Sequence, residues 1–317
     1  MKTVVSLQDL LELEIRPGPL LDEYRRLSEA AVRAWPSSAL REVACQACGS
    51  ADARPAFERF GLAYKECVAC GTVYLSPRPD EATLAEDART SEAARFWRER
   101  LLPETEEARR EKILLPRADW VRDALAEYAA GTDGVIDLRP HEAPAVRRPD
   151  VRRPDVRSPD VSRPDLQVGR QGVGAVTAFE VFDRAADLPS LVRAVRAALA
   201  PGGLLFVTAP SISGFELQVL WERARTIAPP EKLNVLSMAG FRALFGDGWE
   251  ILEMSTPGMF DVETVRRAVE AEPDAPWPRI VRALVSDTDG QRRMELQEYL
   301  QRVRLASFAR LIVRRTD

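Results

Sequence analysis

Four cysteines in two pairs are the residues whose types and spacing most clearly predict chemistry. Cys45 and Cys48 form the first pair, Cys67 and Cys70 form the second, and the chain has no other cysteine. Two thiolates three positions apart reach one ion only if the backbone turns tightly, and a glycine follows each pair. This spacing is typical of a tetrahedral zinc site. Because four protein ligands leave no open coordination position, the metal is expected to hold structure and to perform no reaction.

Two disulfides are the alternative for the same cysteines. No cleavable signal is expected at residues 1–13, because acidic residues fall where its apolar core would run. We expect a cytoplasmic protein, and in that compartment paired cysteines more often bind metal than form bridges. The pattern therefore favours zinc.

The composition predicts a globular protein. A chain of 317 residues, 45% of them hydrophobic, is long enough for one large domain with a smaller module. The net charge of -4 argues against a general role on nucleic acid or on a membrane surface. No apolar run approaches the roughly 20 residues needed to cross a bilayer. The expected partners are a small-molecule substrate or another protein, with no nucleic acid and no membrane.

Four segments with different patterns divide the chain. Residues 1–40 carry leucines at helical spacing, interrupted by a Pro-Gly-Pro turn at 17–19. The zinc-binding module is expected over 41–80. Residues 81–130 are rich in Ala, Glu, Arg and Leu, which predicts two or three helices that act as a linker or lid. Residues 131–317 form the largest segment.

Short apolar runs after residue 131 predict the strands of a buried sheet. These strands are expected at 134–138, 175–179, 204–208, 249–254 and 307–314. An amphipathic helix at 188–199 and a turn at 200–203 precede the third strand. The last two strands, separated by helices between 262 and 304, are expected to pair as an antiparallel edge. Strand, helix, turn and strand in this order indicate an α/β layer.

Several motifs in this order resemble class I S-adenosylmethionine-dependent methyltransferases from residue 44 onward. The chain is most similar to the subgroup with an N-terminal zinc-binding domain, which includes the sugar C-methyltransferases of deoxysugar biosynthesis. The matching stretches are CQACG (45–49), CVACGTVYLSPRP (67–79), TAFEV (177–181), LAPGGLL (199–205) and TPGMFDV (256–262).

The resemblance implies a Rossmann-like, doubly wound α/β sheet with a small N-terminal zinc-binding module and a helical linker. S-adenosylmethionine would lie across the carboxyl ends of the first strands. The residues implied to bind it are Asp137, Phe179 and Glu180. The implied reaction is methyl transfer to a small molecule, either a sugar-like compound or a natural-product intermediate.

The segment after the first strand departs from that pattern. The resemblance implies a glycine-rich loop, but residues 139–144 read RPHEAP. Proline fixes φ and removes a donor, while arginine and histidine add bulk, so the change works against cofactor binding. Residues 146–166 then contain four five-residue repeats, each with a proline. They predict an extended loop or a docking strip for a partner.

No single residue is assigned a catalytic role. The only histidine, His141, lies in the altered loop, and Arg184 and Lys232 stand where related methyltransferases commonly have histidine. A lysine acts as a base only if burial lowers its pKa. The other candidate acids or orienting groups are Glu180, Tyr64 and Asp261. The candidates to hold the ribose hydroxyls are Asp150, Asp155, Asp160 and Asp165.

Two hypotheses of different classes follow. The first is a small-molecule methyltransferase, in which the protein aligns the cofactor's methyl group with a substrate. The second is a catalytically inactive pseudo-methyltransferase, a zinc-stabilised scaffold that binds a ligand or a protein partner. The motifs favour the first hypothesis, while the loop without glycine and the repeats favour the second.

Overall fold

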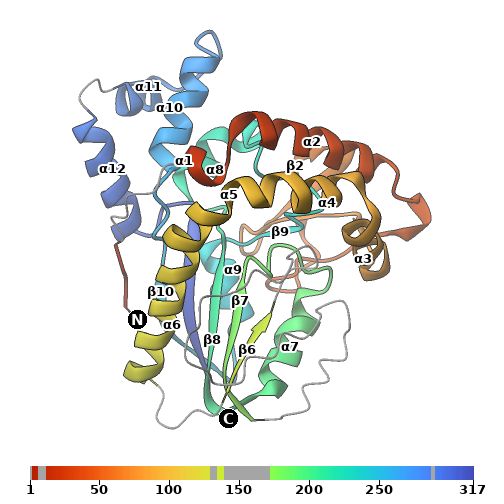
Figure 1. Cartoon of the computed structure of the whole chain (residues 1–317), viewed down its shortest axis with the longest axis vertical. Helices are drawn as coiled ribbons and strands as arrows, with labels where there is room; N and C mark the ends of the chain where they lie inside the picture. Colours follow the sequence, from red (N-terminus) through yellow and green to blue (C-terminus); the bar gives the residue numbers. More distant parts are fainter. Residues whose placement is uncertain (1, 6–11, 129–133, 139–171, 287–289) are drawn as a thin grey trace.

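The computed structural model describes residues 2–5, 12–128, 134–138, 172–286 and 290–317 (Figure 1). Its centre is a five-stranded sheet with the order β10-β11-β8-β7-β6. The strands are β6 (Val135–Leu138), β7 (Val173–Phe179), β8 (Leu199–Pro210), β10 (Trp249–Ser255) and β11 (Phe308–Arg315). β6, β7 and β8 are parallel, and β11 runs antiparallel to both of its neighbours. The predicted mostly parallel sheet and its antiparallel edge pair are confirmed.

The turn predicted at 200–203 lies within β8 and does not precede it. Val173 pairs with Leu199, and Ala175 then pairs with Leu204, so the residues between them bulge out of the ladder. Gly203 allows this close approach, because a Cβ there would lie 2.8 Å from a backbone oxygen. The continuous apolar run after the bulge continues the strand.

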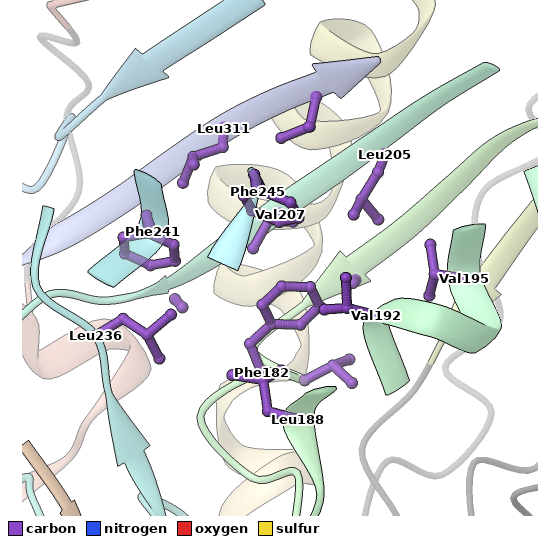
Figure 2. Packing of buried hydrophobic residues seen from close by; sticks show 14 of the residues in the cluster. Phe182, Leu188, Val192, Val195, Leu205, Val207, Leu236, Phe241, Phe245 and Leu311 are labelled. Carbon is purple, nitrogen blue, oxygen red and sulfur yellow. The ribbon is translucent and has the colours of Figure 1, made fainter. Parts of the chain in front are cut away.

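Both faces of the sheet are buried. On one face, α6 (Leu115–Tyr128) packs Trp120 against Phe206. On the other face, α7 (Leu188–Ala198) and α9 (Met238–Leu244) pack against Leu205 and Val207, as Figure 2 shows. Successive side chains of a strand point to opposite faces, which explains why β8 is apolar without interruption.

The cysteine module contains a second sheet with the order β2-β3-β4-β9. Its strands are β2 (Ala53–Arg59), β3 (Leu62–Cys67), β4 (Val73–Leu75) and β9 (Asn234–Val235). β9 comes from the large domain, far along the chain, so residues 41–80 do not complete their own sheet. A two-stranded pair, β1 (Leu40–Arg41) with β5 (Arg78–Pro79), closes the module.

Helices cover the end of the central sheet where β6, β7 and β8 finish (Figure 1). The N-terminal and linker helices are α1 (Glu12–Ile15), α2 (Gly18–Arg33), α3 (Glu81–Thr90), α4 (Glu92–Phe96) and α5 (Leu102–Arg109). The later ones are α8 (Phe215–Leu220), α10 (Asp261–Ala271), α11 (Arg279–Val285) and α12 (Gln291–Arg302). The Pro-Gly-Pro turn proves to be the start of α2. Lys2 forms an extended bridge with Glu253 of β10, so the N-terminus is not helical throughout.

The buried side chain of Arg78 joins the module to the large domain. Arg78 is 2% exposed. Its Nε donates to the carbonyl oxygen of Leu75, one Nη donates to that of Ala186, and the other donates to that of Leu233 and to Asn234 Oδ1 (2.9 Å). Burial lowers the pKa of Arg78 to about 10. The guanidinium therefore satisfies oxygen acceptors on three segments at once.

Replacing Arg78 is expected to destabilise the whole fold. In Arg78→Met, several buried oxygen atoms lose their donor, at about 1–3 kcal/mol each, so we expect a loss of about 3 kcal/mol or more, measured by urea unfolding. The matched control is Arg54→Met, because Arg54 pairs with Glu66 on the module's surface. It should change stability little. Equal unfolding midpoints for the two variants would contradict the role of Arg78.

Candidate functional site

A cavity of about 530 Å³ lies at the carboxyl ends of β6, β7 and β8. Leu138, Phe179 and Thr208 line it from the strand ends, and Tyr24 and Trp97 line it from the covering helices. The volume is within the range of small-molecule sites, and this end of a parallel sheet is where such folds bind ligands. The arrangement is suited to a small molecule.

Basic side chains outnumber acidic ones around the cavity. The basic residues are Arg16, Arg25, Arg109, Lys112, Arg117, Arg184, Arg225, Lys232 and Arg310. The acidic residues are Glu106, Asp137, Glu180, Glu216, Glu231 and Asp261. Several of the basic residues pair with carboxylates that do not line the cavity, so the larger number of basic residues in the lining is not a net positive charge. Whether the cavity favours an anionic ligand therefore depends on which of its basic side chains lack a carboxylate partner.

Glu180 follows the end of β7 and is held by an ion pair. Both of its carboxylate oxygens accept from Arg117 of the α6 helix (2.9 and 2.5 Å), and Thr208 Oγ1 donates a third hydrogen bond at 2.9 Å. Burial raises the pKa of Glu180, but the charge and hydrogen bonds of Arg117 outweigh burial and hold the pKa below its ordinary value. The Arg117 guanidinium also lies 5.1 Å from the centre of the Phe179 ring.

Asp137 occupies the third position of β6, which is the strand at one end of the described sheet. It is 1% exposed, and its Oδ1 accepts a hydrogen bond of 2.5 Å from Thr177 Oγ1. The two residues are directly paired in the register of β6 and β7. The three residues implied to bind the cofactor thus line one cavity, and both carboxylates among them already accept from protein donors. Their role as cofactor ligands stays a prediction.

Arg184 and Lys232, which stand where the resemblance implies histidine, also line the cavity. Lys232 forms an ion pair with the fully buried Asp183, and Arg184 lies 3.6 Å from the carboxylate of Glu231. Tyr24 donates a hydrogen bond of 2.7 Å to Glu231. Burial raises the pKa of Glu231, whereas Arg184, Lys232 and Tyr24 together bring it below its ordinary value. The two basic side chains are therefore fixed by acidic partners.

The remaining described candidates, Tyr64 and Asp261, have different surroundings. Tyr64 is 1% exposed and donates to the carbonyl oxygen of Lys232 (2.7 Å), so it holds the backbone of a residue that lines the cavity. Asp261 lines the cavity and accepts from the backbone N–H of Ser307 (2.7 Å) and from Gln297 Nε2 (3.2 Å). Burial raises the pKa of Asp261. Other candidates lie outside the described residues: His141, the loop at 139–144, the repeats at 146–166, and Asp150, Asp155, Asp160 and Asp165.

The four cysteine thiols come together away from this cavity. All four sulfur atoms lie within 4.8 Å of one another, with Cys45–Cys70 at 3.6 Å and Cys48–Cys67 at 3.5 Å. A tetrahedral zinc with bonds of about 2.3 Å would place its sulfur ligands about 3.8 Å apart. The predicted cysteine cluster is confirmed, and its geometry fits a tetrahedral metal.

The two cysteine turns have the same backbone geometry. The N–H of Gly49 donates to the carbonyl oxygen of Cys45, and that of Gly71 donates to Cys67, each at 2.8 Å. The glycine φ angles are 76° and 70°, in the left-handed region that glycine adopts without a steric cost. Ser237 Oγ donates to the carbonyl oxygen of Cys70, which ties the cluster to the start of α9.

Sequence reasoning did not find Arg117 or Arg109. Both lie in the helical stretch 81–130, where arginines are frequent and no spacing distinguishes one from another. Their importance depends on which helix face meets the strand ends, and this is set by tertiary packing.

No protein-family model and no curated protein matches the chain. Solved structures of methyltransferases do match its fold. A chain from the Haloferax volcanii complex of the Trm112 methyltransferase activator and a methyltransferase is 19% identical, with 67% of this chain and 94% of that one covered and a TM-score of 0.40. Coclaurine N-methyltransferase, bound to N-methylheliamine and S-adenosylhomocysteine (SAH), is 14% identical. The match covers 62% of this chain and 72% of that one, with a TM-score of 0.34.

A methyltransferase from Mesorhizobium loti is 16% identical, with 62% of this chain and 98% of that one covered and a TM-score of 0.33. With identities and TM-scores this low, these likenesses describe the fold and carry no argument about activity, substrate or cofactor. The chain has a mixed α/β fold with a mostly parallel central sheet, like methyltransferases, and a cysteine cluster in its N-terminal region.

A protein partner stays a prediction. None of the described helices has both the length and the apolar character needed to cross a membrane.

The Arg117–Glu180 pair predicts a pH-dependent contribution to stability. A carboxyl group whose pKa is lowered by folding stabilises the protein above its unfolded pKa of about 4.3, and this contribution is lost as the pH falls through the folded pKa. Glu180→Gln leaves Arg117 without its acidic partner and should cost about 3 kcal/mol at pH 7, but less at pH 3. Urea unfolding at both pH values measures this difference.

The matched control is Glu86→Gln, because Glu86 pairs with Arg89 on the surface. It should change stability little at either pH. A stability difference between wild type and Glu180→Gln that is equal at pH 7 and pH 3 would contradict an ionised, paired Glu180.

Proposed function

We propose that this protein binds a small molecule in the cavity at the strand ends and does not use S-adenosylmethionine as a methyl donor. The observation that carries the proposal is the Arg117–Glu180 ion pair, which occupies the end of β7. The resemblance implies that this carboxylate serves the cofactor, yet its oxygens already accept three hydrogen bonds from Arg117 and Thr208. A bound cofactor would have to replace these contacts.

The position of Arg117 supports the same proposal. S-adenosylmethionine carries its reactive methyl on a sulfonium cation, and the Arg117 guanidinium already lies against the Phe179 ring. The face of this ring is therefore in contact with a cation of the protein itself, and the Arg117–Glu180 pair fills the end of β7. The residues present therefore fit S-adenosylmethionine poorly.

The second candidate function is methyl transfer to a small molecule, favoured by the position of the cavity. It lies at the carboxyl ends of parallel strands, where folds of this kind bind their ligands. In that case Lys232 and Asp183 would be the residues to examine for proton transfer, since their ion pair borders the cavity. This candidate requires Arg117 to leave Glu180.

Calorimetric titration with S-adenosylmethionine and S-adenosylhomocysteine (SAH) separates the two candidates. The proposal predicts no detectable binding of either compound to a folded sample whose metal content has been measured. Binding tighter than about 100 μM, or roughly -5.5 kcal/mol, would contradict it and favour methyl transfer. An Arg117→Leu sample, with the ion pair removed, shows whether this pair is what excludes the compounds.

We further propose that the four cysteines hold zinc as a structural ion. Four thiolates in tetrahedral reach of one ion are a ligand set that zinc prefers, and none of the four lines the cavity. The ion would connect the two cysteine turns, one before β2 and one after β3. Its contribution is then to folding and not to a reaction.

Cys67→Ser tests this metal site. Because structural zinc contributes directly to folding, the variant should release zinc and melt at a lower temperature. Metal content by atomic emission and thermal melting by circular dichroism are the two measurements. Val68→Thr is the control, because Val68 is the exposed neighbour of Cys67. Full metal retention with unchanged melting in Cys67→Ser would refute the zinc site.

A further inference from the structure

Arg109 differs in its partners from most of the other basic residues around the cavity. Arg117, Arg184, Lys232, Arg310 and Lys112 each form an ion pair with a carboxylate. Among the described residues, no carboxylate lies within ion-pair distance of Arg109. Its charge is therefore not neutralised by direct contact with a protein group.

The Arg109 side chain is nevertheless held rigidly. Its Nε donates to Thr105 Oγ1 and one Nη donates to the carbonyl oxygen of Ile15, both at 2.8 Å. Its guanidinium lies 5.4 Å from the centre of the Trp97 ring, in a cation–π contact. None of the described contacts uses the second Nη, and Arg109 lines the cavity. The geometry presents an oriented donor to a ligand.

The surroundings of Arg109 disfavour its positive charge. Burial, with smaller contributions from the charges of Arg16 and Arg117, lowers the pKa of Arg109 to about 10. The more distant carboxylates of Glu180 and Glu231 act in the opposite direction but do not outweigh burial. An arginine in such a position gains most from an anionic partner, because the partner removes both the desolvation cost and the repulsion. A neutral or cationic group would leave that cost in place.

We propose that Arg109 binds an acidic oxygen group of the ligand, either a carboxylate or a phosphate. This inference rests on the proposed function, in which the cavity takes a small molecule. Tyr24 and Trp97, whose ring centres lie 5.2 Å apart, form an aromatic wall beside Arg109 and favour a ligand with a ring or apolar body. The ligand is then a small acid or phosphate ester that carries such a body.

Probe binding tests this inference on the full-length, metal-loaded protein. The probes are phenyl phosphate and benzoate, with benzamide as the neutral analogue of benzoate, titrated by calorimetry. At least one of the two anions should bind, and benzamide should not. Binding of phenyl phosphate alone indicates a phosphate ligand, and binding of benzoate alone indicates a carboxylate ligand. Absence of binding by both anions overturns the inference.

Variants then test whether Arg109 makes the contact. Arg109→Met should weaken binding of the anion at least tenfold. The control Arg98→Met should leave binding unchanged, because Arg98 lies near Arg109 in sequence, donates to the carbonyl oxygen of Ala88 and does not line the cavity. If Arg109→Met does not fold, Arg109→Lys provides the test. This variant keeps the positive charge but loses the planar guanidinium, whose N–H donors have a fixed geometry. It should weaken binding several-fold, and unchanged affinity overturns the inference.

The two proposals fail in different experiments. Binding of S-adenosylmethionine would overturn the proposed function whatever the anionic probes do. Failure of the probes to bind, in a protein that also ignores S-adenosylmethionine, would overturn only the role of Arg109.

Discussion

The buried guanidinium of Arg78 holds the cysteine module against the two loops that form one side of the cavity. It donates to the carbonyl oxygen of Ala186 on one loop and to that of Leu233 on the other. These loops also carry Arg184 and Lys232, whose side chains border the cavity. Because buried acceptors without donors are costly, the loops cannot separate from the module without a large loss of stability. The module thus helps to position one side of the cavity, although none of its four cysteines lines the cavity.

In the proposed function, the ligand of the cavity is selected by which charged side chains already have a partner of opposite charge. At the strand ends, Glu180 is ionised and paired with Arg117, while at the helical side no carboxylate in the described part of the chain pairs with Arg109. The strand ends are therefore occupied by a neutral ion pair, and the positive charge without a direct carboxylate partner lies at the helical side. In the proposed function, this ion pair takes the place that the resemblance implies for a cofactor, and fold alone does not establish methyl transfer.

The sequence predicted those parts that depend on local pattern. The apolar runs at β7 and β8 and the cysteine spacing each mark their structure within a few residues, because burial on both faces and tetrahedral ligation constrain neighbouring positions. The Arg117–Glu180 pair joins residues 63 positions apart, and β9 completes a sheet begun before residue 60. Neither pairing leaves a periodic signal, because each depends on how distant segments pack. Arg78 was within a recognised motif, but its burial among carbonyl oxygens was visible only in three dimensions.

A crystal structure of the metal-loaded protein grown with saturating SAH tests the central claim most directly. Because SAH lacks the sulfonium charge, any repulsion by basic side chains at the strand ends would be weaker for SAH than for S-adenosylmethionine. We predict that Arg117 remains paired with Glu180 and that no adenosine density appears at the carboxyl ends of β6 and β7. Adenosine bound there, with Arg117 displaced from Glu180, would contradict the account.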